Sequence, residues 1–177
     1  MSASTSSLDL HTSAADGPRP TAEQVWKAVT GASFAVLSHV TPAGQPRSSG
    51  VVYTVAGDRM YVVVAKNSWK ARQIATSADV AVTVPVRRGG IMSLLFPIPP
   101  ATISFPAHAV VHPAAALRDF PHLAKLARLI PSERREACSI IEIRPVGHYV
   151  TYGLGVPLAR MRDTTRSRAR VAVAGSA

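Results

Sequence analysis

Several residue types and segments on which common protein classes depend are scarce or missing in this sequence. Cysteine occurs once in 177 residues, as Cys138, so the chain can form no internal disulfide and no cysteine-rich zinc site. A reducing cytoplasm is the expected compartment for such a chain. No apolar run reaches the ~20 residues that span a bilayer, because prolines interrupt the longest one at 91–103. The first residues lack a basic segment followed by an apolar one, so we expect no signal peptide and no membrane association.

The sequence also lacks the motifs of several catalytic chemistries. It contains no G-x-S-x-G nucleophile motif, no Walker loop, no G-x-G-x-x-G fingerprint and no H-E-x-x-H zinc motif. Its 10 carboxylates are scattered, and no two are spaced as an acid–base pair. His108 and His112 can share one face of a strand, but two histidines without a third ligand make a poor metal site. We therefore predict no metal site and assign no catalytic residue.

Positive charge is what the sequence has in excess. It carries 20 Lys and Arg against 10 Asp and Glu, a formal net charge of +10. Arginine, the more common of the two cations here, suits bidentate contacts with phosphate or carboxylate groups. Five arginines fall near the C-terminus: Arg160, Arg162, Arg166, Arg168 and Arg170. They could bind nucleic acid by neutralising its phosphates, although a solvated basic tail is the simpler interpretation.

The order of apolar and turn segments predicts a mainly β fold. Six segments are typical of strands: 34–40, 47–55, 60–65, 80–86, 101–111 and the residues around Ile141 and Ile143. Hairpin turns join the first three, and a short helix precedes the fourth, which favours a six-stranded antiparallel barrel with flanking helices. Thr21 and Gln24 form a capping box for a helix ahead of the barrel. We expect a disordered tail at 1–20, one domain at 21–155 and a basic tail at 156–177.

The segment 60–74 predicts an anion site. A β-branched strand ends there, and Ser68 is a good N-cap for a helix that begins at Trp69. Lys70 and Arg72 then place two positive charges in the first turn, where the helix dipole is already positive. That arrangement is unfavourable unless an anion neutralises it, and phosphate commonly binds at a helix N-terminus. A solvated surface helix is the alternative interpretation.

The middle part of the chain resembles a known family. Residues 34–86 resemble the flavin-binding split-barrel proteins related to pyridoxamine 5′-phosphate oxidase, through the segments AVLSHVTPAGQPRSSGVVY, YVVVAKNSWKARQI and VAVTVPV. The resemblance implies a phosphate site for FMN made by Arg47, Ser68, Lys70 and Gln73. Arg72 lies where many deazaflavin-using relatives also have a basic residue.

Further cofactor contacts follow from the same resemblance. Ser48 and Ser49, with Gly50, would let an isoalloxazine ring approach the second strand closely. Trp69 stands where the oxidase itself often has arginine, and the lysine that often ends its second-strand motif is missing here. These differences, with the absence of the oxidase's C-terminal substrate segment, argue for a relative that acts on a different, unidentified small molecule.

The resemblance implies an oxidoreductase that uses FMN or the deazaflavin coenzyme F-420. It also implies a homodimer with each cofactor at the interface, and we expect residues 94–100 and the outer face of the last strand to be buried there. A small barrel is filled by side chains, so the cofactor must bind outside it. The alternative is a non-enzymatic protein that binds FMN, nucleic acid or haem. The possible axial haem ligands are His39, His108, His112 and His148.

Overall fold

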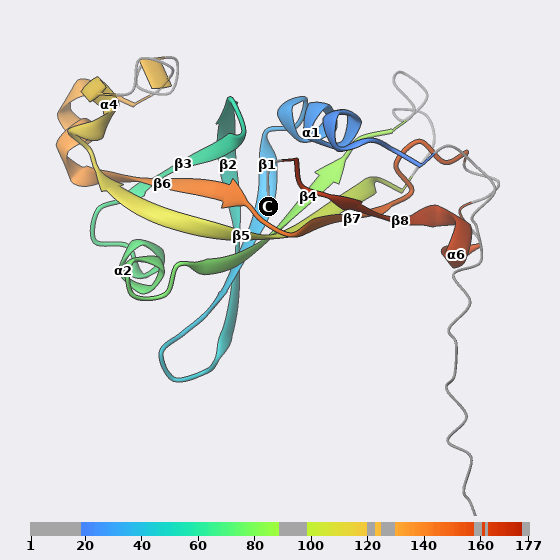
Figure 1. The fold of residues 1–177 in the computed structure, drawn as a ribbon. Helices are drawn as coiled ribbons and strands as arrows, with labels where there is room; N and C mark the ends of the chain where they lie inside the picture. Colours follow the sequence, from blue (N-terminus) through green and yellow to red (C-terminus); the bar gives the residue numbers. More distant parts are fainter. Residues whose placement is uncertain are drawn as a thin grey trace, which may run out of the picture.

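The computed structural model describes residues 19–88, 99–119, 123–124, 130–157, 161 and 163–174 (Figure 1). Its strands are β1 (Phe34–Val40), β2 (Pro46–Ala56), β3 (Arg59–Ala65), β4 (Asp79–Val86), β5 (Ala101–Pro113), β6 (Cys138–Pro145), β7 (His148–Tyr152) and β8 (Arg168–Ala172). Its helices are α1 (Ala22–Thr30), α2 (Trp69–Thr76), the short α4 (Ala116–Asp119) and α6 (Thr164–Ser167), and the 3-10 helix η2 (Ser132–Ala137). Most of the expected tail at 1–20 and most of the apolar segment 94–100 lie outside the described residues.

Six of these strands form a closed antiparallel barrel, which confirms the predicted fold class. The strand order is β4-β1-β2-β3-β6-β5, and pairing between β4 and β5 closes the ring. The strand bounds agree with the predicted ones to within two residues at the segments where a range was predicted. Apolar residues recur at every second position of β1 and β5 and point into the barrel, as the period of a strand requires.

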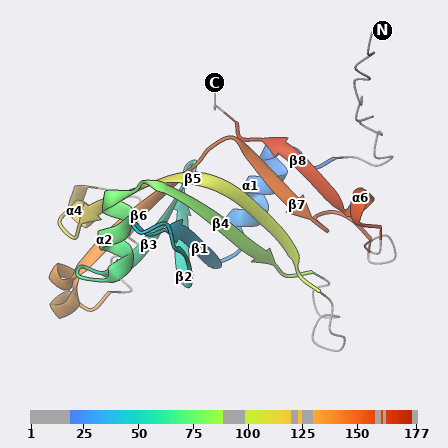
Figure 2. The ribbon, with the colours of Figure 1, turned by 90° about the horizontal axis from the view of Figure 1, so that it is seen from below.

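The two remaining strands extend the sheet beyond the barrel (Figure 2). β7 pairs with the first part of β5, and β8 pairs along the whole of β7. Part of the expected C-terminal tail is therefore a strand. The reason is a period of two within the basic segment: Arg168 and Arg170 are exposed, whereas Ala169 and Val171 between them are partly buried on the other face. These two arginines therefore lie on the outer face of a strand and not in a solvated coil.

Helices cover both ends of the barrel. α1 begins at the predicted capping box, in which the Gln24 amide N–H donates to Thr21 Oγ1 (3.2 Å) and the Thr21 amide N–H donates to Gln24 Oε1 (2.9 Å). Its Val25 and Val29 are fully buried at the end where β2 turns into β3. α2 follows the other end of β3 and buries Ala71. None of the helices in the described part is long and apolar enough to cross a membrane.

The barrel interior is filled by side chains. Leu37, Met60, Ile103, Phe105 and Ile143 are almost completely buried there. A close-packed interior of this kind leaves no room for a cofactor, so any cofactor has to bind at an end or on the outer surface of the barrel.

Candidate functional site

The N-terminus of α2 forms as the sequence predicts. Ser68 is the N-cap, and its Oγ accepts a hydrogen bond from the Ala71 amide N–H at 3.3 Å. Lys70 is partly buried, with its Nζ 5.9 Å from the centroid of the Trp69 ring, and Arg72 is exposed. Among the described residues, neither Lys70 nor Arg72 forms an ion pair. The positive charge predicted at this helix N-terminus is therefore not neutralised by an acidic side chain of the described part.

His39 connects this helix to the β1–β2 hairpin. Its Nε2 is 2.6 Å from Gln73 Oε1, and its ring centroid is 5.2 Å from that of Trp69 with a tilt of 32°. Across the β1–β2 ladder, His39 lies opposite Arg47. The structure thus brings Trp69, Gln73 and the strand segment that carries Arg47 to one end of the barrel.

From the sequence alone, His39 was predicted only as a possible haem ligand, and its contact with α2 was not predicted. The burial of His39 could have been predicted from its place in β1, where every second residue (Ala35, Leu37 and His39) faces inward. A histidine at the inward-facing end of such a series is expected to be buried, and His39 is only 4% exposed. The partner on α2, 34 residues away, could not be inferred from that pattern.

Among the described residues, two buried polar atoms at this end of the barrel have no hydrogen-bond partner: His39 Nδ1 and Ser49 Oγ. Ser49 lies opposite Leu37 in the ladder, two residues along β2 from Arg47, so His39, Arg47 and Ser49 share the inward face of the hairpin. A buried polar group without a partner costs about 1–3 kcal/mol, and few native proteins tolerate many of them. Two such atoms on one face make this end of the barrel a candidate position for an ordered water or a polar ligand.

Solved structures share this architecture. A protein of Listeria innocua named as a candidate pyridoxamine 5′-phosphate oxidase superposes with a TM-score of 0.54 at 14% identity, over 70% of this chain and 92% of that one. An F-420 reductase superposes with a TM-score of 0.52 at 16% identity, over 73% and 96%. A heme-binding protein of Mycobacterium smegmatis gives 0.56 at 17%, over 77% and 56%. No protein-family model matches the sequence, and no curated protein matches it significantly.

The chain has the fold of the pyridoxamine 5′-phosphate oxidase-like split barrels. Identities below 20% establish that fold and leave the chemistry to the site itself.

On the outer surface of the split barrel, β1 and β2 present a different set of residues. Ser48 Oγ lies 2.8 Å from Ser38 Oγ, so this hydroxyl is already paired. The ring of Phe34 covers Gly50, where an added Cβ would come within 2.9 Å of Phe34 Cε2. Ser48 and Ser49 therefore lie on opposite faces of β2, because neighbouring side chains of a strand alternate. They cannot serve one cofactor surface together, and a ring that approaches Gly50 has to displace Phe34.

The four histidines that could ligate haem are spread over the split barrel. His108 Nδ1 is 2.8 Å from Asp79 Oδ1, and His112 Nε2 is 3.0 Å from Glu142 Oε2. His148, on β7, is paired with an arginine of β8. The described residues contain no group of three or more His, Cys, Asp or Glu side chains that could hold a metal ion.

Proposed function

We propose that this protein binds a flavin-type cofactor, FMN or coenzyme F-420, and serves as an oxidoreductase for a small molecule. The cofactor's phosphate would bind where α2 meets the β1–β2 hairpin. The proposal draws on the shared fold, since an F-420 reductase has the same split barrel.

The observation that carries the proposal is a pair of buried atoms, His39 Nδ1 and Ser49 Oγ, that have no hydrogen-bond partner in the described part of the chain. They lie beside cations that pair with no acidic side chain of that part. Arg47 on the same face as these atoms forms no ion pair with the described residues. A phosphate group is an anion with several acceptor oxygens, so it matches unpaired cations, a hydroxyl and a helix N-terminus at once. The residues present therefore fit the phosphate of such a cofactor.

Each residue of this set has a distinct binding role. Arg47 and Lys70 would balance the phosphate charge, and the Ser68 cap holds the first turn of α2 in place for it. Trp69 offers an exposed aromatic surface, because its side chain is 40% accessible. A bound flavin or deazaflavin supplies hydride transfer itself. The protein's part is then to hold the cofactor, orient it and exclude water, which requires no protein nucleophile.

Titration of the purified chain with FMN and with F-420 tests the proposal. Lys70→Ala should weaken the binding of the preferred cofactor by roughly ten- to a hundredfold, because one charge-assisted contact to phosphate contributes ~1.5–3 kcal/mol. Lys27→Ala is the matched control, since Lys27 is an exposed lysine of α1 at the opposite end of the barrel. Its affinity should stay within a factor of about three of the wild type.

Equal affinities of the Lys70→Ala variant and the wild type for both cofactors would refute the phosphate site. The absorption spectrum of the purified protein distinguishes a flavin from haem, because a haem Soret band would instead indicate haem binding, as in the protein of Mycobacterium smegmatis.

We also infer a homodimer. Phe34, Val40 and Val52 are 46%, 51% and 71% exposed on the outer face of β1 and β2, and Phe34 lies directly opposite Val52 in the ladder. Soluble monomers rarely expose neighbouring large apolar side chains of this kind. A second copy packed on this face would remove these apolar side chains from water.

Light scattering tests the dimer. Val52→Asp should shift the protein to a monomer at micromolar concentration, whereas Val110→Asp, which changes a 52% exposed valine of β5, should leave the dimer intact. A wild-type monomer that holds one cofactor per chain would refute the inference.

A further inference from the structure

A second candidate site lies on the β7–β8 extension, far from the cofactor site. A hollow of about 500 Å³ is lined by Val150, Thr164, Thr165, Arg168, Ala169 and Arg170. It lies between the short helix α6 and the outer strands of the sheet. Figure 1 places β8 and α2 at opposite ends of the molecule, so the two sites are separate. A volume of this size is in the range of small-molecule sites.

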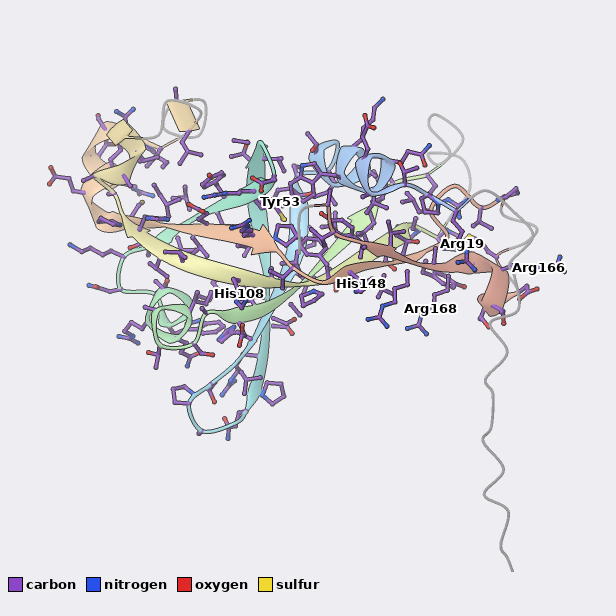
Figure 3. The ribbon with its side chains drawn as sticks, viewed as in Figure 1. Arg19, Tyr53, His108, His148, Arg166 and Arg168 are labelled. Atoms are coloured by element: carbon purple, nitrogen blue, oxygen red, sulfur yellow. The ribbon has the colours of Figure 1, made fainter. Side chains whose placement is uncertain are left out.

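Strand geometry directs two arginines to the same face of this hollow. Arg168 lies opposite Tyr152 and Arg170 opposite Val150, so both arginines and both partners share one face of the β7–β8 ladder. At the rise of a strand, their Cα atoms are about 6.5–7 Å apart. His148 belongs to the same face, and Arg170 Nη2 donates toward its Nδ1 at 3.5 Å. Figure 3 shows Arg168 projecting from the side of β8 that is turned away from α1.

The charges on this face are not balanced. None of the residues that line the hollow is acidic, and Arg168 and Arg170 form no ion pair with the described part of the chain. Asp163, the acidic residue next to α6, is already engaged. Its Oδ1 caps α6 by accepting from the Thr165 and Arg166 amides, and its Oδ2 is 3.2 Å from Arg166 Nε. Within the described part of the chain, two neighbouring guanidinium groups therefore have no acidic partner.

The lining has the chemistry of a phosphate site. Guanidinium groups bind phosphate oxygens bidentately, and threonine hydroxyls are among the groups that commonly contact phosphates. Two guanidinium groups that lie two residues apart on one strand can each contact a different phosphate group of the same ligand. An isolated surface cation would lack both the hollow and the hydroxyl groups.

We propose that this hollow binds two neighbouring phosphate groups of a phosphate chain. This phosphate-bearing ligand is either the triphosphate of a nucleotide or the backbone of a single-stranded nucleic acid. The proposal is independent of the cofactor site, because the two share no residue.

The test uses the full chain and two probes. The first is a fluorescein-labelled oligodeoxythymidylate of about fifteen nucleotides, which matches common single-strand site sizes, and its binding is followed by anisotropy over a salt series. The second is ATP, added as a competitor and titrated directly. Arg168→Gln/Arg170→Gln should weaken binding by roughly tenfold or more. It should also reduce the slope of log affinity against log salt by about 1.4, the value for two lost phosphate contacts to a single strand.

Arg134→Gln/Arg135→Gln is the matched control, since it removes the same charge from two exposed arginines of η2. It should change the affinity by less than about threefold. Competition by ATP assigns the triphosphate, and oligonucleotide binding that ATP does not displace assigns the nucleic-acid backbone. Equal losses in the two double variants, or no binding of either probe to the wild type, would overturn the proposal.

Discussion

The contact between His39 and Gln73 allows stability and ligand binding to be separated experimentally. The 2.6 Å hydrogen bond joins the buried His39 side chain to the partly buried Gln73, while His39 Nδ1 has no partner in the described part of the chain. Replacing one partner alone leaves the other buried without its hydrogen bond, which costs about 1–3 kcal/mol. We therefore expect His39→Leu and Gln73→Leu each to lower the free energy of unfolding by about that amount.

The double variant His39→Leu/Gln73→Leu should behave differently. It removes both partners together and also removes the unsatisfied Nδ1, and replacing two bonded groups by apolar ones of similar shape is often nearly neutral. Leucine also keeps a large apolar contact with the Trp69 ring. The double variant should therefore unfold within about 1 kcal/mol of the wild type. Because the two single costs together are about 2–6 kcal/mol, a neutral double variant gives a coupling free energy of about that size between the two positions.

Urea unfolding of the four proteins in the cycle, without cofactor, measures these free energies. Titration of the same samples with FMN and F-420 measures binding, which should fall at least about tenfold in the double variant if His39 Nδ1 contacts the ligand. The reasoning is refuted if the double variant loses more than about 3 kcal/mol and binds the cofactor as tightly as the wild type. In that case His39 would be a structural residue of the α2 contact only.

Other predictions concern burial and charge. Ser49→Ala removes the second unsatisfied atom, so it should raise the free energy of unfolding by about 0.5–1.5 kcal/mol and weaken cofactor binding, as urea unfolding and titration would show. Glu142→Ala removes the buried carboxylate that pairs with Arg59 and His112, so it should cost about 3 kcal/mol. Asp79→Ala, in an exposed pair with His108, should cost less than about 1 kcal/mol, and thermal unfolding compares the two variants. Burial raises the pKa of Tyr53 and of Tyr149 to about 12. Both phenols are protonated in the folded and the unfolded state well below pH 10, so the free energy of unfolding should fall between about pH 10 and 12, by up to ~2.7 kcal/mol per tyrosine. Burial also raises the pKa of Tyr61, so Tyr53→Phe should remove only the contribution of Tyr53, up to ~2.7 kcal/mol, from the fall that urea unfolding measures across that range.

Local chemistry in the sequence was sufficient for the elements of the barrel. The capping box at Thr21 and the Ser68 cap each satisfy free amides within a single turn, so they can be recognised without knowing the rest of the chain. Alternating apolar residues in β1 and β5 likewise follow from the strand period, and hairpin turns set the order of the first strands. The position of the cationic first turn of α2 at Lys70 was determined by the sequence for the same reason.

Only the tertiary structure decided which distant residues meet. His39 contacts Gln73 across 34 positions, a pairing set by the packing of α2 against the barrel and carried by no local pattern. That Ser48 and Ser49 lie on opposite faces of β2 follows from the strand period, but which of the two faces inward depends on which face of β2 is buried. The segment that contains Arg168 forms the strand β8 because β7 offers a free edge for pairing. From the sequence alone, the same segment is predicted to be a charged tail. Hydrogen bonds between strands and burial of one face are properties of the assembled sheet, which is why the site and the basic hollow appeared only in the folded chain.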